Sequence, residues 1–167
     1  MRSSSREEVV EVLDALRTAH KRALDLTFDM LTTPERLAVL ETFEGFRRQQ
    51  PAVEHALINQ LVEQADAAEL GGRLAAVLAD RLRISRAEAF RRVHEAADLG
   101  ERRALNGEPL EPVLAATAAA QRNGELGAGH VAVIRGFMHR LPDIVDVETR
   151  AKAEAQLARL SREHRPD

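Results

Sequence analysis

The sequence predicts an all-α protein, a multi-helix bundle with a long kinked helix and a helix-turn-helix-like segment. Three observations support this fold class. The 167 residues include only 9 glycines and 6 prolines, the two residue types that most often interrupt helices. Apolar residues recur at helical spacing along most of the chain. No segment has the pattern of a β-strand. A chain of this length corresponds to about one domain, on a prior of roughly 100–200 residues.

The first third of the chain predicts two long helices. Ser5 and Glu8 have the spacing of a capping box, so a helix with a narrow buried stripe is expected over residues 6–26. Thr33 followed by Pro34 is a typical helix start, because proline at the first helical position loses no hydrogen bond. An apolar stripe then continues as far as Ala65.

Pro51 lies inside this second apolar stripe. The segment is therefore either one kinked helix or two helices that meet near residues 49–51. The kinked helix is the favoured alternative. Both halves are expected to lie against the first helix, because apolar stripes of this length would otherwise form an association surface.

The rest of the chain predicts shorter helices over residues 74–83, 85–99, 112–120 and 131–141 and from 147 to the C-terminal region. Ser85 and Asp146 are expected N-caps, Pro112 is an expected helix start, and Gly100, Gly124 and Pro142 end helices. A polar loop is expected from Glu101 to Pro109. The expected apolar positions are Ala87, Phe90, Val93 and Ala97; Val131, Ile134, Met138 and Leu141; and Val147, Ala151, Leu157 and Leu160.

The domain organisation is expected to be a single helical domain, 1–167. A subdivision into long antiparallel helices at 1–68 and a compact bundle at 69–167 is the alternative. The last helix runs into the final residues without a closing element. We therefore expect the chain to be a fragment.

Composition excludes several functional classes. The 24 basic and 27 acidic side chains give a net charge of −3, so DNA or anionic lipid would bind only through a local patch. The chain has no cysteine, which excludes disulfides, cysteine-based zinc sites and thiol catalysis. No run of 18 apolar residues or secretory signal is present. We expect a cytoplasmic protein that contacts no membrane.

Residues 74–93 resemble a helix-turn-helix. Ala79 lies where two helices would touch, Ile84 would point inward from the turn, and Ser85 would cap the second helix. The candidate DNA contacts are Arg83, Arg86, Arg91 and Arg92. Arg83 stands where glycine is usual, however. A second interpretation makes this a solvated surface, because Glu88 and Arg92 are spaced as an ion pair and Arg91 lies near both Glu88 and Glu95.

No pattern indicates catalysis, a cofactor or a small-molecule substrate. Six histidines are present, but none has the spacing of a metal site, and the sequence G-x-S-x-G is absent. The glycine-rich segment 124–130 lacks a preceding strand and a following Lys-Ser/Thr pair, so it is interpreted as a tight interhelical turn rather than an anion site.

Residues 78–99, together with 124–134, resemble the thirteen-E-twelve repeat family, which is common in actinobacteria. The similarity covers the chain from about Glu35 onward. This resemblance implies a helical domain of unknown function that usually lies N-terminal to an HNH endonuclease domain, and it implies that this chain is an incomplete copy. The HNH module is missing here: Asn59, Asn106 and Asn123 are not grouped with histidines. No catalytic residue is therefore transferred.

Two functional hypotheses follow. The first is a non-catalytic, DNA-associated helical domain that binds double-stranded DNA through the four arginines. The second is a protein-interaction or oligomerisation module, with a homodimer as its simplest form, because the stripe from Leu37 to Ala65 exceeds what the chain could cover. A complete enzyme ranks below both.

Overall fold

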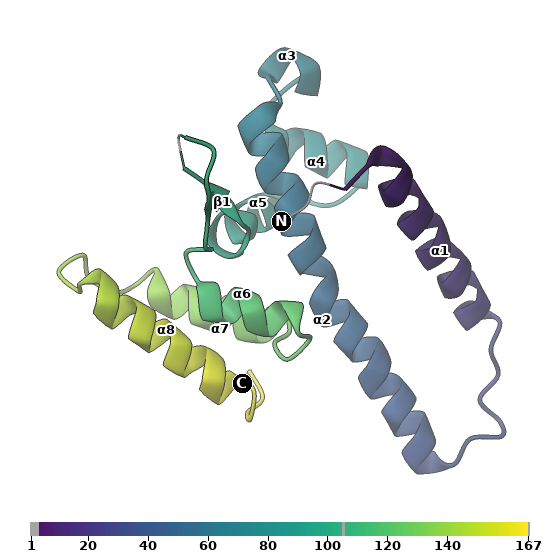
Figure 1. Ribbon diagram of the computed structural model, residues 1–167. Helices are drawn as coiled ribbons and strands as arrows, with labels where there is room; N and C mark the ends of the chain where they lie inside the picture. Colours follow the sequence, from purple (N-terminus) through teal and green to yellow (C-terminus); the bar gives the residue numbers. More distant parts are fainter. Residues whose placement is uncertain (1–3, 105, 167) are drawn as a thin grey trace. The chain divides into compact units, whose positions relative to one another are not determined.

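The computed structural model describes residues 4–104 and 106–166 and confirms the all-α fold class (Figure 1). The chain divides into two compact units, Met1–Leu40 and Glu41–Asp167. The first unit contains α1 (Arg6–Leu24) and the beginning of α2 (Thr33–Gln64). The second contains the remainder of α2 and every element that follows it.

The first helix begins as predicted. The Ser5 hydroxyl accepts a hydrogen bond from the Glu8 N–H at 3.1 Å, which satisfies one of the free donors at the helix start. The predicted buried stripe is wrong, because none of the α1 residues is buried. Val9, Leu13 and Leu16 are instead exposed.

The second helix is continuous through Pro51, which confirms the single-helix alternative. Its cap differs from the prediction by one residue. The Thr32 N–H and hydroxyl both donate to the Glu35 carboxylate at 2.7 Å. Thr32 therefore holds the cap in place of Thr33, since its hydroxyl and the glutamate three residues later are spaced as in a capping box.

A helix-turn-helix follows α3 (Ala67–Leu70) and consists of α4 (Leu74–Leu82) and α5 (Arg86–Leu99). Ala79 and Ala89 are buried where these helices meet, and Ile84 packs against them from the turn. The small side chains allow the helix backbones to approach closely. The predicted α5 stripe is wrong at Ala87, Phe90 and Ala97, which are exposed. The buried positions are Ala89, Glu95, Ala96 and Leu99.

The expected polar loop contains a short hairpin that the sequence did not predict. Its strands, β1 (Arg102–Arg103) and β2 (Pro109–Leu110), are antiparallel. The hairpin leads into α6 (Ala115–Arg122), which begins three residues after Pro112. Gly124 has φ +78° and forms the predicted stop before α7 (Ala128–Met138). Asp146 caps α8 (Val147–Ser161), its carboxylate accepting from the Thr149 N–H at 2.8 Å.

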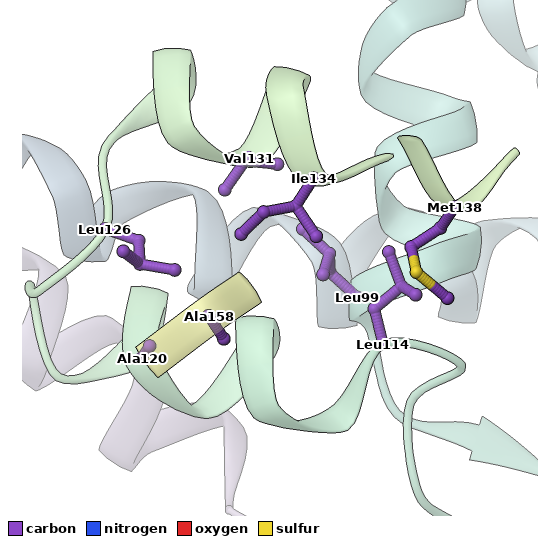
Figure 2. Close-up of a cluster of buried hydrophobic side chains, with 8 residues drawn as sticks. All are labelled: Leu99, Leu114, Ala120, Leu126, Val131, Ile134, Met138 and Ala158. Carbon is purple, nitrogen blue, oxygen red and sulfur yellow. The ribbon is translucent and has the colours of Figure 1, made fainter. Parts of the chain in front are cut away.

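The main core of the second unit lies among α5, α6, α7 and α8. Figure 2 shows the buried side chains converging between these helices. Val131, Ile134 and Met138 are buried as predicted, whereas the predicted Val147 is 83% exposed. The buried α8 residues are Glu154 and Ala158. The core side chains are Leu99, Leu114, Ala120, Leu126, Val131, Ile134, Met138 and Ala158.

Candidate nucleic-acid interface

The turn between α4 and α5 is held in a fixed conformation. Arg83 has φ +55°, the left-handed region in which glycine is usual and a side chain is unfavourable. The Ile84 N–H donates to the Ala79 carbonyl at 3.1 Å, and the Ser85 hydroxyl accepts from the Glu88 N–H at 3.1 Å. These contacts fix both ends of the turn and place Arg83 and Arg86 on either side of it.

Two of the four candidate arginines belong to an ion-pair network. Arg91 donates two hydrogen bonds to Glu88, at 2.7 and 2.8 Å, and a third to Glu95. Arg92 donates to Glu88 at 2.8 Å and to Glu54 on α2 at 3.0 Å. The contacts within α5 are those that the solvated-surface interpretation predicted, and the contact from Arg92 to Glu54 was not predicted.

Glu88 is the centre of this network. Its hydrogen bonds from Arg91, and then those from Arg92, lower the pKa of the carboxyl from 4.5 to about 2. The same contact with Glu88 raises the pKa of Arg91. The positive charges of Arg91 and Arg92 are thus largely balanced within the protein, so binding a phosphate would require them to exchange one anion for another.

The charges of the other two candidate arginines are not balanced by acidic side chains. Arg83 and Arg86 are exposed, and neither side chain has a hydrogen bond or ion pair within the described part of the chain. The same holds for Arg73 and Arg81, which lie just before and within α4. Residues 73–86 carry one acid, Asp80, so this segment has a local charge of 4 − 1 = +3. We call Arg73, Arg81, Arg83 and Arg86 the unpaired arginines.

Apart from Arg86 and Arg91, the exposed residues of α5 carry no formal charge when His94 is neutral. Phe90 is 53% exposed, and its ring lies edge-on to that of His94 with centroids 6.3 Å apart. Ala87 and Ala97 are also exposed. The positive charge of the helix-turn-helix therefore lies at α4 and the turn rather than along the whole of α5.

A buried polar network that the sequence analysis missed fixes α5 in place. Glu95 is 4% exposed and lies 3.6 Å from the Nε2 of His55 on α2. Burial opposes ionisation of Glu95, but the contact with His55 and the charge of Arg91 outweigh it and lower the pKa of Glu95. Asp98 binds Arg135 of α7 at 2.7 Å and His139, the residue that follows α7, at 2.8 Å.

A signal for part of this network is present in the sequence. Glu95 and Asp98 are one helical turn apart, as are Arg135 and His139, so each pair shares a helix face. Which face of α5 meets α7 is decided by packing, and the helix period alone does not identify it.

Glu154 is a buried structural position that the sequence did not predict. Its carboxylate, on α8, accepts from the Thr117 N–H at 2.6 Å, the Thr117 hydroxyl at 2.5 Å and the Ala116 N–H at 3.2 Å. These donors lie in the first turn of α6, whose N-cap residue, Leu114, offers no side-chain hydrogen bond. Glu154 thus caps α6 from a distant helix.

The cleft between α2 and α6 is lined by five alanines and by the polar residues His55, Glu101, Glu111, Gln121 and Arg122. Both polar side-chain atoms of Gln121 are buried and have no hydrogen bond with a described residue. In residues 4–104 and 106–166, no group of three or more His, Asp or Glu side chains could hold a metal ion. The absence of a cofactor stays a prediction.

The structure also bears on three other features that the sequence analysis considered: the glycine-rich segment, Asn59 and membrane-spanning helices. Residues 124–127 form an interhelical turn in which Leu126 is buried, and residues 128–130 begin α7, where the Nδ1 of His130 accepts from the Gly127 N–H at 3.3 Å. Asn59 has a structural role, donating to the carbonyls of Ala96 and Glu101. Within the described residues, no helix is long and apolar enough to span a membrane.

Comparison with known proteins gives close mycobacterial relatives. Uncharacterized protein Rv1128c of Mycobacterium tuberculosis H37Rv is 62% identical over 164 residues, which is 98% of this chain and 36% of the relative. Uncharacterized protein Rv1945 of the same strain is 55% identical over 167 residues, 100% of this chain and 37% of the relative. The chain therefore spans little more than a third of the length of these relatives.

No solved structure matches the chain. Residues 37–167 match a family described as "Domain of unknown function (DUF222)". This match covers α2 from its second turn, the helix-turn-helix with the unpaired arginines, and the α5–α8 core. The chain belongs to the DUF222 family.

Proposed function

We propose that this chain is a non-catalytic helical domain that contacts the phosphate backbone of double-stranded DNA through the unpaired arginines. The observation that carries the proposal is their location. They lie from the residue before α4 to the first residue of α5, around the turn of a helix-turn-helix, and the side chain of none is neutralised by a described residue. In the longer relatives, the domain would hold DNA for chemistry performed elsewhere in the protein, as the resemblance to HNH-associated proteins implies.

The structure divides the four candidate contacts into two pairs with different expected roles. Arg83 and Arg86 can bind phosphate without breaking a contact. Arg91 and Arg92 would first have to leave Glu88, Glu95 or Glu54. We therefore assign phosphate binding to Arg83 and Arg86, with Arg73 and Arg81 beside them, and assign Arg91 and Arg92 to holding α5 against α2.

The expected salt dependence of DNA binding follows from the release of counterions from the phosphates. Each phosphate contact contributes about −0.9 to the slope of log K against log salt. Four contacts give a slope of about −3.6, and loss of two of them reduces it to about −1.8. Binding of this kind is independent of DNA sequence, because phosphate contacts carry no base information.

The test is a fluorescence-anisotropy titration of the chain with random-sequence duplex DNA at several salt concentrations. The Arg83→Ala/Arg86→Ala variant should bind more weakly and with half the salt slope. The matched control is Arg140→Ala/Arg159→Ala, which removes the same charge from two exposed arginines outside the helix-turn-helix, one just after α7 and one on α8. Absence of binding at low salt, or equal loss in both variants, would overturn the proposal.

A second candidate function is protein association. The observation that favours it is the exposure of large apolar side chains on the outward face of α2. Salt distinguishes the two candidates, because phosphate contacts weaken steeply as salt rises and apolar contacts do not.

A further inference from the structure

The outward face of α2 in the second unit is apolar and uncharged. Phe46, Val53 and Leu57 are 57%, 67% and 57% exposed, and Gln50 lies between the first two along the same face. Residues separated by four, three and four positions share one side of a helix. The buried residues His55 and Ile58 lie on the other side. We call Phe46, Gln50, Val53 and Leu57 the α2 seam.

The spacing of the α2 seam is the same in both directions along the helix. Reversing the helix places position 46 opposite 57 and position 50 opposite 53. An interface between two copies related by a two-fold axis requires this self-matching. The mean spacing, about 3.7 residues, is close to the 3.6 residues per turn of a straight α-helix, so the four positions stay in line along one face.

We propose that the α2 seam joins two copies of this chain, with their α2 helices antiparallel about a two-fold axis. The proposal rests on the second candidate function and names its partner. Phe46 of one copy packs beside Leu57 of the second, and Gln50 packs beside Val53. Pro51 does not obstruct this contact, because it lies on the inner side of α2, where it lines a cleft with Glu95.

The charges at the edge of the seam favour the antiparallel direction. Arg47 and Glu54 lie along one edge, with side chains 69% and 44% exposed, and within each copy they pair with Glu44 at 3.4 Å and with Arg92 at 3.0 Å, so an intermolecular contact would be a second partner for each. In the proposed alignment, Arg47 of one copy lies within two residues of Glu54 of the second, about 3 Å along the helix axis. Opposite charges thus meet at both ends. The seam between them has no charged residue, a property typical of interface cores.

The first experiment measures the mass of the full chain by sedimentation equilibrium over a wide range of concentrations. The monomer mass is 18.5 kDa, and we expect twice that value. Val53→Glu should return the chain to the monomer, because it places two carboxylates in an apolar interface. Val62→Glu is the matched control, since Val62 is 58% exposed but lies half a turn away around α2. The control should remain dimeric, with unchanged circular dichroism for both variants.

A cross-linking experiment tests the register directly, because the chain has no native cysteine. A mixture of Gln50→Cys and Val53→Cys chains should form a disulfide-linked heterodimer on mild oxidation. A mixture of Gln50→Cys and Val62→Cys chains should not. If the Val53→Glu chain remained dimeric, the α2 seam would not be the dimer interface, but the proposed association function would still hold. A monomeric mass at every concentration would overturn both. Neither result affects the DNA titration, which the Val53→Glu chain can undergo separately.

Discussion

Glu154 gives the sharpest prediction about stability. Its carboxylate is 4% exposed and accepts from Ala116 and from the N–H and hydroxyl of Thr117. Glu154→Ala would leave these donors at the start of α6 without an acceptor. A hydrogen bond to a charged group contributes about 1.5–3 kcal/mol, and the contributions are not additive. We expect Glu154→Ala to lower the free energy of unfolding by about 3–5 kcal/mol.

Two milder changes keep the reasoning testable if Glu154→Ala fails to fold. Glu154→Gln retains one acceptor oxygen and should cost about 1–2 kcal/mol. Thr117→Val removes only the hydroxyl and should cost about 1.5 kcal/mol in the native chain. In a chain that already carries Glu154→Gln, Thr117→Val should cost almost nothing if the glutamine amide no longer accepts from the Thr117 hydroxyl. The double-mutant cycle measures this coupling between residues 117 and 154.

The assay is urea-induced unfolding followed by circular dichroism, with the slope m compared between variants. The control is Glu148→Ala on the same helix, whose side chain is 78% exposed and pairs with Lys152. Exposed pairs of this kind contribute less than about 1 kcal/mol. If Glu154→Ala cost no more than Glu148→Ala, the interhelical cap would not stabilise α6, and the argument would be refuted.

Two further predictions concern stability. Gly100→Ala should destabilise the chain by about 1–3 kcal/mol, because its new methyl group would lie 2.3 Å from the side-chain nitrogen of Asn59. Gly136→Ala, where the nearest atom is the flexible end of Arg140 at 3.7 Å, should instead stabilise α7 by about 0.5–1 kcal/mol. Thermal unfolding distinguishes the two, and equal effects would contradict the reasoning. The folded-state pKa of Glu88 lies below its ordinary value, at about 2, so its stabilising contribution is complete above pH 4.5 and is lost as the pH falls to about 2. Glu88→Gln should cost about 1 kcal/mol at neutral pH and reduce the loss on acidification; an unchanged acid transition would argue against this.

Much of the fold was predictable because its signals are local. Ser5, Ser85 and Asp146 cap helices through donors three residues away, so sequence spacing alone identifies them. Gly124 stops α6 through its own backbone conformation. The Ala79 contact in the helix-turn-helix was also predicted, because a short turn between two helices restricts how they can meet.

The errors concern which side of a helix is buried. The predicted α5 stripe followed apolar character to Phe90, but the buried positions include Ala89 and the charged Glu95. Close approach of two helices favours the smallest side chain at the crossing, whatever its hydrophobicity. Likewise, the apolar Val147 of α8 is exposed while Glu154 is buried, because the start of α6 supplies three donors to its carboxylate.

The same distinction applies to the candidate interface. Sequence spacing placed Arg91 near Glu88 and Glu95, since both contacts lie within one turn of α5. The link from Arg92 to Glu54 spans 38 residues, and only the packing of α2 against α5 brings them together. The lack of partners for Arg83 and Arg86 is likewise visible only in three dimensions, because pairing depends on every neighbouring element.

The sequence by itself therefore determined the helical class, most helix ends and the helix-turn-helix, because capping, turn conformation and helical period act over a few residues. Tertiary structure decided which faces are buried, which charges are balanced and which helix caps another. Those properties depend on contacts between segments distant in sequence, where a buried charge is stable only if its partners are brought to it.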